Sequence, residues 1–217
     1  MKNHETLYVF DFDGTITYVD TFKIFLILRL LNPKYWIKTF LEICKLITYR
    51  NISMFRFRIQ KIIWMEECDR LSFFNKIIES KFFKLLIRED VFEFLNKLLN
   101  DNKVILITAN EISLVNSFIK IFLGKKMDRI HLIGSNFEID NSKIIKGKEK
   151  LKELEKYLKK TNNKSKIISF FDSRSDLNMS KVTNTNVVVG KFNYLLIKLF
   201  YADVKYFKDF LIQTKSK

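Results

Sequence analysis

Two aspartates near the start of the chain, two positions apart, could take part in phosphoryl chemistry. Asp11 and Asp13 directly follow the short apolar run Leu7–Phe10, and Gly14 and Thr15 come next. The apolar run predicts a buried parallel strand, and ligands of parallel sheets bind beyond the carboxyl ends of the strands. Carboxylates placed there can hold a divalent cation and attack phosphorus. The plainer interpretation is an ordinary Asp-Gly turn after a strand.

Two later strands are also predicted to end in polar residues. Thr108 closes one apolar run and offers a hydroxyl to a phosphate oxygen, and Asn110 follows it as a substrate-binding candidate. Asp172 and Asp176 follow another run, and two acids four positions apart at a strand end suit the oxygen shell of Mg²⁺. Taken singly, each segment could equally be a helix cap followed by a solvated side chain.

A cluster of lysines supplies the positive charge that phosphoryl chemistry needs. Lys146, Lys148 and Lys150 lie at the start of a predicted helix. One of them could pair with the nucleophile and with the phosphoryl oxygens as a point charge. For most of these lysines a solvated basic helix face is the better interpretation.

Strands and helices are predicted to alternate along most of the chain. Beyond the first strand, strands are expected at 103–108, 130–134, 166–171 and 186–189. Helices are expected at 91–99, 111–123, 149–160 and, as a closing helix, 194–212, with a hairpin at 136–145. This alternation favours an α/β fold with a doubly wound, mostly parallel, Rossmann-like sheet.

The segment between the first two predicted strands has a different pattern. Its apolar residues recur at helical spacing, with helices expected from Pro33 and at 53–64 and 71–83. We therefore predict a catalytic core built from residues 1–17 and 89–217. Residues 18–88 are predicted to form an all-helical cap, inserted after the first strand.

Together these segments resemble the haloacid-dehalogenase-like phosphohydrolase superfamily. Asp11–Thr15 matches its first motif, Thr108 its second, and Asp172 and Asp176 its fourth. The resemblance implies that Asp11 is the nucleophile and Asp13 the acid/base, and that both belong with Asp172 and Asp176 to an Mg²⁺ site. Thr108 would contact the phosphoryl oxygens, and Thr15 is assigned to the substrate-binding turn.

The helical insertion and a Gly-x-Glu-Lys segment are similar to the phosphoserine-phosphatase-like subgroup. That segment, Gly147–Lys150, implies Lys150 as the functional lysine, with Lys148 and Lys146 as second and third choices. Asp20 stands where those enzymes carry a glutamate that grips the substrate amine. The chain departs from the superfamily at Phe171, where glycine is usual, and this larger side chain could narrow or reshape the metal pocket.

The predicted cap is basic as well as apolar. Residues 21–65 contain nine Lys or Arg residues and a single acid, Glu42. In this respect the chain looks similar to C-type phosphatidylglycerophosphate phosphatases, which implies a lipid phosphate substrate and contact of the cap with an anionic membrane. The alternative is a helical bundle with a solvated basic rim, acting on a small phosphometabolite.

Composition bounds the remaining possibilities. The net charge of +15 favours anionic partners, and two cysteines in 217 residues fit neither a metal-site spacing nor a disulfide framework. A cytoplasmic location is expected, with peripheral contact at the inner membrane face as an alternative. We predict an Mg²⁺-dependent phosphomonoester hydrolase that forms an aspartyl-phosphate. The alternatives are a phosphotransferase with the same chemistry, or a basic nucleic-acid-binding protein on an inactive scaffold.

Overall fold

The structure, a computed structural model, describes most of the chain outside the predicted cap. The described residues are 6–30, 33, 36–37, 40–41, 44, 70–136, 144–163, 165–201 and 203–215. The helices expected from Pro33 and at 53–64, and the hairpin expected at 136–145, lie wholly or largely outside these ranges.

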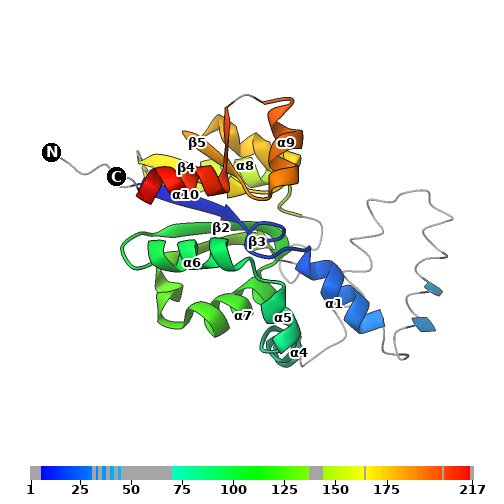
Figure 1. The fold of residues 1–217 in the computed structure, drawn as a ribbon. Coiled ribbons are helices and arrows are strands. Elements are labelled where there is room, and N and C mark those ends of the chain that lie inside the picture. Colours follow the sequence, from blue (N-terminus) through cyan, green and yellow to red (C-terminus); the bar gives the residue numbers. More distant parts are fainter. Residues whose placement is uncertain are drawn as a thin grey trace.

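Within the described part of the chain, six parallel strands form one sheet in the order β3-β2-β1-β4-β5-β6 (Figure 1). The strands are β1 Thr6–Asp11, β2 Val104–Glu111, β3 Ile130–Ser135, β4 Lys166–Phe171, β5 Thr185–Val188 and β6 Val204–Tyr206. The order reverses between β1 and β4, so a crevice opens at the carboxyl ends of these two central strands. The predicted α/β class with a doubly wound parallel sheet is confirmed.

Helices connect the strands and cover both faces of the sheet (Figure 1). The α-helices whose whole extent lies within the described residues are α1 Thr21–Leu30, α4 Arg70–Ile78, α5 Lys81–Leu85, α6 Glu89–Leu98, α7 Ile112–Leu123, α8 Lys148–Lys160, α9 Lys191–Lys198 and α10 Phe207–Lys215. The 3₁₀ segments η2 Gly124–Arg129 and η3 Arg174–Lys181 follow α7 and β4, respectively. Within the described residues, no helix combines the length and the apolar character needed to cross a membrane.

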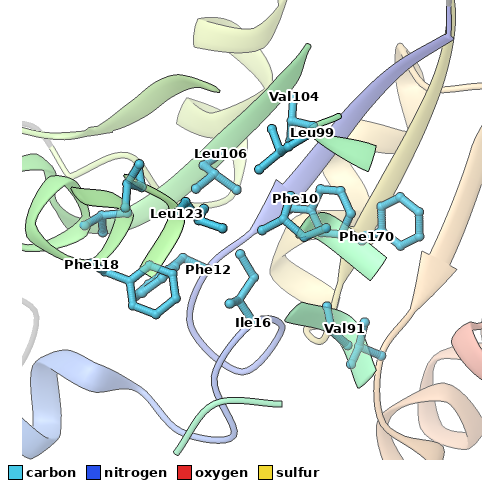
Figure 2. Close-up of a cluster of buried hydrophobic side chains, with 14 of the residues drawn as sticks. Phe10, Phe12, Ile16, Val91, Leu99, Val104, Leu106, Phe118, Leu123 and Phe170 are labelled. Atoms are coloured by element: carbon cyan, nitrogen blue, oxygen red, sulfur yellow. The ribbon is translucent and has the colours of Figure 1, made fainter. Parts of the chain in front are cut away.

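Alternation along the strands divides the core into two hydrophobic clusters. Phe10, Leu106 and Phe170 contribute to a cluster with side chains of α4, α6, α7 and α10, part of which Figure 2 shows. The Phe10 and Phe170 rings stack there with centroids 4.2 Å apart. Val9 and Phe171 face the other way, into a cluster with side chains of α8 and α9. Burial on both faces explains why the central strands are apolar throughout.

The segment predicted as the cap leaves and re-enters the sheet domain at one place. Thr17 forms an antiparallel bridge with Ile87, and the Tyr18 amide donates to the Leu86 carbonyl at 2.8 Å. Later parts of this segment pack into the core, since Phe83 of α5 belongs to the first cluster. The bridge fixes the path of the chain immediately after the Asp11–Thr15 turn.

Two predicted helices differ from those observed. The expected closing helix at 194–212 is wrong, because α9 ends at Lys198 and is followed by the strand β6 and by α10. β6 has only three residues, and a strand so short shows no alternation that could reveal it. The helix expected at 71–83 is interrupted at Ser80, whose hydroxyl caps α5 by accepting from the Phe83 amide at 3.1 Å.

Candidate active site

The first motif lies at the crevice between β1 and β4. Asp11 is the last residue of β1, and Asp172 directly follows β4. Between them the chain turns at Gly14, which has a φ of +78°, and a Cβ there would lie 2.0 Å from Asp172 Oδ2. Glycine is therefore required twice over, by the backbone angle and by the close approach of the two segments.

Lys150 joins the first and fourth motifs in a buried ion network. Its Nζ atom lies 2.6 Å from Asp11 Oδ1 and 2.8 Å from Asp176 Oδ1, and all three side chains are at most 6% exposed. Lys150 reaches the crevice from the first turn of α8, on the side of that helix that also buries Leu151 and Leu154. Of the three candidate lysines, it alone forms an ion pair with Asp11 among the described contacts.

Opposing effects set the charges in this network. Burial raises the pKa of Asp11 well above its ordinary value, and Asp176 adds to the rise, while Lys150 acts in the opposite direction. Burial by itself would lower the pKa of Lys150, but the carboxylates of Asp11 and Asp176 outweigh burial and raise that pKa. The lysine therefore stays charged and holds the Asp11 carboxylate in place.

Asp13 is held by a separate set of hydrogen bonds. Its Oδ1 atom accepts from the Thr21 amide at 2.8 Å and from the Thr21 hydroxyl at 2.6 Å, and its Oδ2 atom accepts from Asn110 Nδ2 at 3.1 Å. Burial raises the pKa of Asp13 to about 6, although the bonds from Thr21 and Asn110 favour the ionised form. A carboxyl group with this pKa can both donate and accept a proton near neutral pH.

Three carboxylates are close enough together to share a metal ion. One oxygen each from Asp11, Asp172 and Asp176 lie within 4.8 Å of one another. Burial, followed by the charge of Asp176, raises the pKa of Asp172 to about 6. The negative charges of these carboxylates repel one another, and a bound divalent cation would relieve that repulsion. Carboxylate oxygens are also the ligands that a hard cation such as Mg²⁺ prefers. The Asp13 side chain, predicted as a fourth ligand, is not part of this group.

A cleft of about 350 Å³ opens over these side chains. Its lining includes Asp11, Asp13, Lys150, Asp172 and Asp176, together with Tyr18, Asp20, Lys23 and Lys146. Five acids and three lysines thus meet at one opening. Asp20 faces the cleft as expected, and Lys23 Nζ lies 3.8 Å from its Oδ2 atom.

Three predicted substrate-contacting residues are buried and do not line the cleft. The Thr108 hydroxyl accepts a hydrogen bond from the backbone N–H of Asn110 at 3.0 Å, and the side chain of Asn110 donates to Asp13; neither Thr108 nor Asn110 lines the cleft. The buried Thr15 hydroxyl makes no hydrogen bond within the described part of the chain. In this structure the Asn110 side chain donates to Asp13, the acid/base candidate. Direct contact of Thr108, Thr15 or Asn110 with substrate stays a prediction.

Phe171, which stands where the family usually has glycine, does not line the cleft. Its side chain is fully buried in the cluster beneath α8 and α9. Alternation along β4 turns Phe171 into the core, and Asp172 after it reaches the crevice, so an effect of Phe171 on the shape of the metal pocket stays a prediction.

Arg88 is a site residue that the motifs did not reveal. Its Nε atom donates to the Gly14 carbonyl at 3.1 Å, and its guanidinium carbon lies 4.4 Å from the centroid of the Tyr18 ring. Its charge also opposes the rise in the pKa of Asp172. An arginine beside the acid pair Glu89-Asp90 resembles any helix start, so the sequence pattern carries no signal for this contact.

Several solved structures, among them these three, share this fold over most of their length. A protein of unknown function from Bordetella pertussis Tohama I has a TM-score of 0.71 at 10% identity, with 94% of this chain and 98% of that one covered. A phosphoserine phosphohydrolase-like protein from Francisella tularensis subsp. tularensis SCHU S4 has a TM-score of 0.58 at 14% identity, with coverages of 93% and 94%. Cytosolic 5'-nucleotidase IIIB bound to cytidine has a TM-score of 0.61 at 14% identity, with coverages of 93% and 79%.

At these identities the three structures establish a shared fold and nothing finer. A search of curated proteins gives no match. Residues 8–181, which contain all four motifs, match the family of haloacid dehalogenase-like hydrolases. That match confirms the resemblance inferred from the motifs and, with it, the expectation of an enzyme of the hydrolase class. The chain belongs to the haloacid dehalogenase-like hydrolase family.

Proposed function

We propose that this hydrolase is an Mg²⁺-dependent phosphomonoesterase that forms an aspartyl-phosphate on Asp11. The observation that carries the proposal is the buried pair between Lys150 and Asp11, which extends to Asp176. Burying three charges together is costly, and a merely structural role would be served as well by apolar side chains. A nucleophile held beside a cation and a metal-binding acid is the arrangement that phosphoryl transfer requires.

In the first step, a carboxylate oxygen of Asp11 attacks phosphorus. The bond between phosphorus and the leaving oxygen breaks, and protonated Asp13 gives its proton to that oxygen. A pKa of about 6 leaves part of the Asp13 population protonated near neutral pH. Lys150 orients Asp11 through the 2.6 Å contact and offsets negative charge on the phosphoryl group.

In the second step, water replaces Asp11 on phosphorus. Asp13, now ionised, takes a proton from the water as its oxygen attacks, and the Asp11–phosphorus bond breaks to release inorganic phosphate. Thr21 and Asn110 hold the Asp13 carboxylate in one orientation for both proton transfers. Mg²⁺ would be held by Asp11 and Asp172, with Asp176 in support, and when bound would neutralise charge on the phosphoryl oxygens.

The substrate proposed is a phosphorylated small molecule or the phosphorylated headgroup of a lipid. The 350 Å³ cleft has room for the phosphoryl group and a modest leaving group. Residues 18–88 would form the cap that completes the pocket, with Tyr18, Asp20 and Lys23 contacting the leaving group from its first residues. Asp20 forms an ion pair with Lys23. This pairing argues against a pocket in which Asp20 serves only to bind a positively charged substrate group such as an amine.

Turnover of para-nitrophenyl phosphate tests the chemistry. Wild type is expected to release inorganic phosphate with Mg²⁺ and to lose most activity in EDTA. Asp11→Asn should abolish turnover, whereas the exposed Asp101→Asn should match wild type. Comparable rates for Asp11→Asn and wild type would exclude Asp11 as the nucleophile. Phosphate transfer to added glycerol would instead identify a phosphotransferase.

Salt-sensitive binding of DNA or RNA, without turnover of any phosphomonoester, would favour the nucleic-acid-binding alternative. That result would overturn the proposed function, because the site would then be catalytically inactive.

A further inference from the structure

The helix α9 turns an apolar stripe toward solvent. The stripe consists of Phe192, Leu195, Leu196, Leu199 and Phe200. These residues lie at spacings of three and four, so they share one face of the helix and the turn that follows it. Phe192 is 72% exposed and Leu199 is 76% exposed, while Ile197 on the opposite side is buried in the core.

Neighbouring exposed apolar side chains on one helix face usually mark a contact surface. Single exposed apolar residues need no explanation, but five at helical spacing are the pattern of a helix that has a partner on each side. One partner of α9 is the sheet, through Ile197 and Tyr194. The exposed stripe on the other side of the helix is available to contact a second partner.

The charges around the stripe indicate an anionic partner. Lys191 and Lys198 are exposed on α9, and residues 190–201 contain no acid. The guanidinium carbon of Arg174 lies 4.0 Å from the centroid of the Phe200 ring, so a third cation borders the stripe. At the surface of an anionic bilayer, apolar side chains can enter the acyl-chain region while flanking Lys and Arg side chains contact the headgroups.

The stripe also has a physical connection to the cleft. Arg174, which stacks on Phe200, lies between Ser173 and Ser175, and both serines line the cleft. At the other end of α9, Gly190 lies close enough to Arg88 that an added Cβ would be 3.7 Å from its Nη2 atom. A surface that engages the stripe is therefore adjacent to the loop that carries Asp176.

We propose that the α9 stripe docks this protein peripherally on an anionic lipid bilayer. The stripe inserts at the level of the headgroups, and Lys191, Lys198 and Arg174 contact lipid phosphates. Docking of this kind places the Ser173–Asp176 loop near the membrane surface, which gives the cleft access to phosphorylated headgroups. Docking itself uses none of the proposed catalytic residues, so it can be tested apart from hydrolysis.

Sedimentation with 100 nm vesicles of phosphatidylcholine and phosphatidylglycerol (3:1) tests the proposal. Wild type should bind these vesicles and bind pure phosphatidylcholine vesicles much more weakly. Phe192→Ser combined with Leu199→Ser should weaken binding by roughly tenfold or more, because each side chain loses its transfer into the interface. Lys198→Glu should weaken it by at least about fivefold, the effect of one surface lysine near an anionic membrane.

Ile212→Ser is the matched control. Ile212 is 68% exposed but belongs to α10, which packs on the opposite face of the sheet. This variant should bind like wild type, and all variants should keep the wild-type rate on para-nitrophenyl phosphate.

Three results would overturn the proposal: no binding of wild type to anionic vesicles, equal binding by the stripe variants, or equal loss with Ile212→Ser. A further overturning result is a wild-type dimer in light scattering that the double variant dissociates, without vesicle binding. That result would make the stripe a contact between two copies.

Discussion

Replacing Asp13 by asparagine should stabilise the fold at neutral pH. The pKa of this carboxyl is about 6 in the folded protein, against an ordinary value of 3.8. Below pH 3.8 the group is protonated in both the folded and the unfolded chain, and the stability that goes with its protonated form is fully present. Between pH 3.8 and 6 the unfolded chain ionises this carboxyl while the partly buried group stays protonated in the folded state. Stability therefore falls across this range, and the contribution of the protonated form is lost once the pH passes the folded pKa of about 6.

The size of the effect follows from the two pKa values. At about 1.4 kcal/mol per pH unit, the difference corresponds to about 3 kcal/mol of lost stability above pH 6. Asparagine is isosteric and never ionises, so Asp13→Asn recovers most of this free energy. The gain is reduced by about 1 kcal/mol, because an asparagine amide facing Asn110 Nδ2 replaces an acceptor with a donor. We expect a net increase of about 2 kcal/mol.

Urea unfolding in EDTA at pH 7.5 and pH 4 measures this difference. The free energy of unfolding should exceed that of wild type at pH 7.5, and the difference should shrink toward zero or below at pH 4. The exposed Asp101→Asn should change stability by less than about 0.5 kcal/mol at either pH. An Asp13→Asn variant less stable than wild type at pH 7.5, or a difference independent of pH, would refute the reasoning.

The remaining predictions concern the turn, the lysine and the metal. Gly14→Ala should cost several kcal/mol in thermal unfolding, because its Cβ would overlap Asp172, whereas Gly124→Ala, with φ +50° but open space around it, should cost only about 1 kcal/mol. Lys150→Met should destabilise the fold by about 3–5 kcal/mol and abolish phosphatase turnover, since it strands the Asp11 carboxylate; unchanged stability would show that the pair is not formed. Adding Mg²⁺ at 100 times its dissociation constant should stabilise wild type by about 2.7 kcal/mol, and a melting temperature that does not move in Mg²⁺ would argue against the metal site.

The parts of the fold that could be predicted are those with strong local periodicity. The central strands are apolar on both faces because both are covered, and this produced continuous runs such as 103–108 that need no tertiary knowledge to interpret. β6 had no such signature. Its residues gain strand structure only by pairing with β5, through the register of Val187 with Lys205, and no local pattern encodes that pairing.

The site divides in the same way. Asp11, Lys150, Asp172 and Asp176 lie near strand ends or a helix start, and parallel topology alone brings strand ends together, so their meeting could be anticipated. The direction of individual side chains could not. Phe171 points into the core and Asn110 lies beneath Asp13 rather than in the cleft. The contact of Arg88 with Gly14 joins residues 74 positions apart, and its geometry exists only once the sheet domain has closed.

The central position of β1 has a consequence for how the chain matures during synthesis. Its neighbours in the sheet are β2 and β4, and Phe10 pairs with Phe170, which is synthesised 160 residues later. At ribosomal speeds of about 5–20 residues per second, the strand that ends in Asp11 waits roughly 8–30 s for this partner. During that interval β1 can pair with β2 on one side, while its other edge has no strand to pair with. The protein should therefore depend on chaperones that bind nascent chains, and slowing synthesis before residue 166 should increase its aggregation.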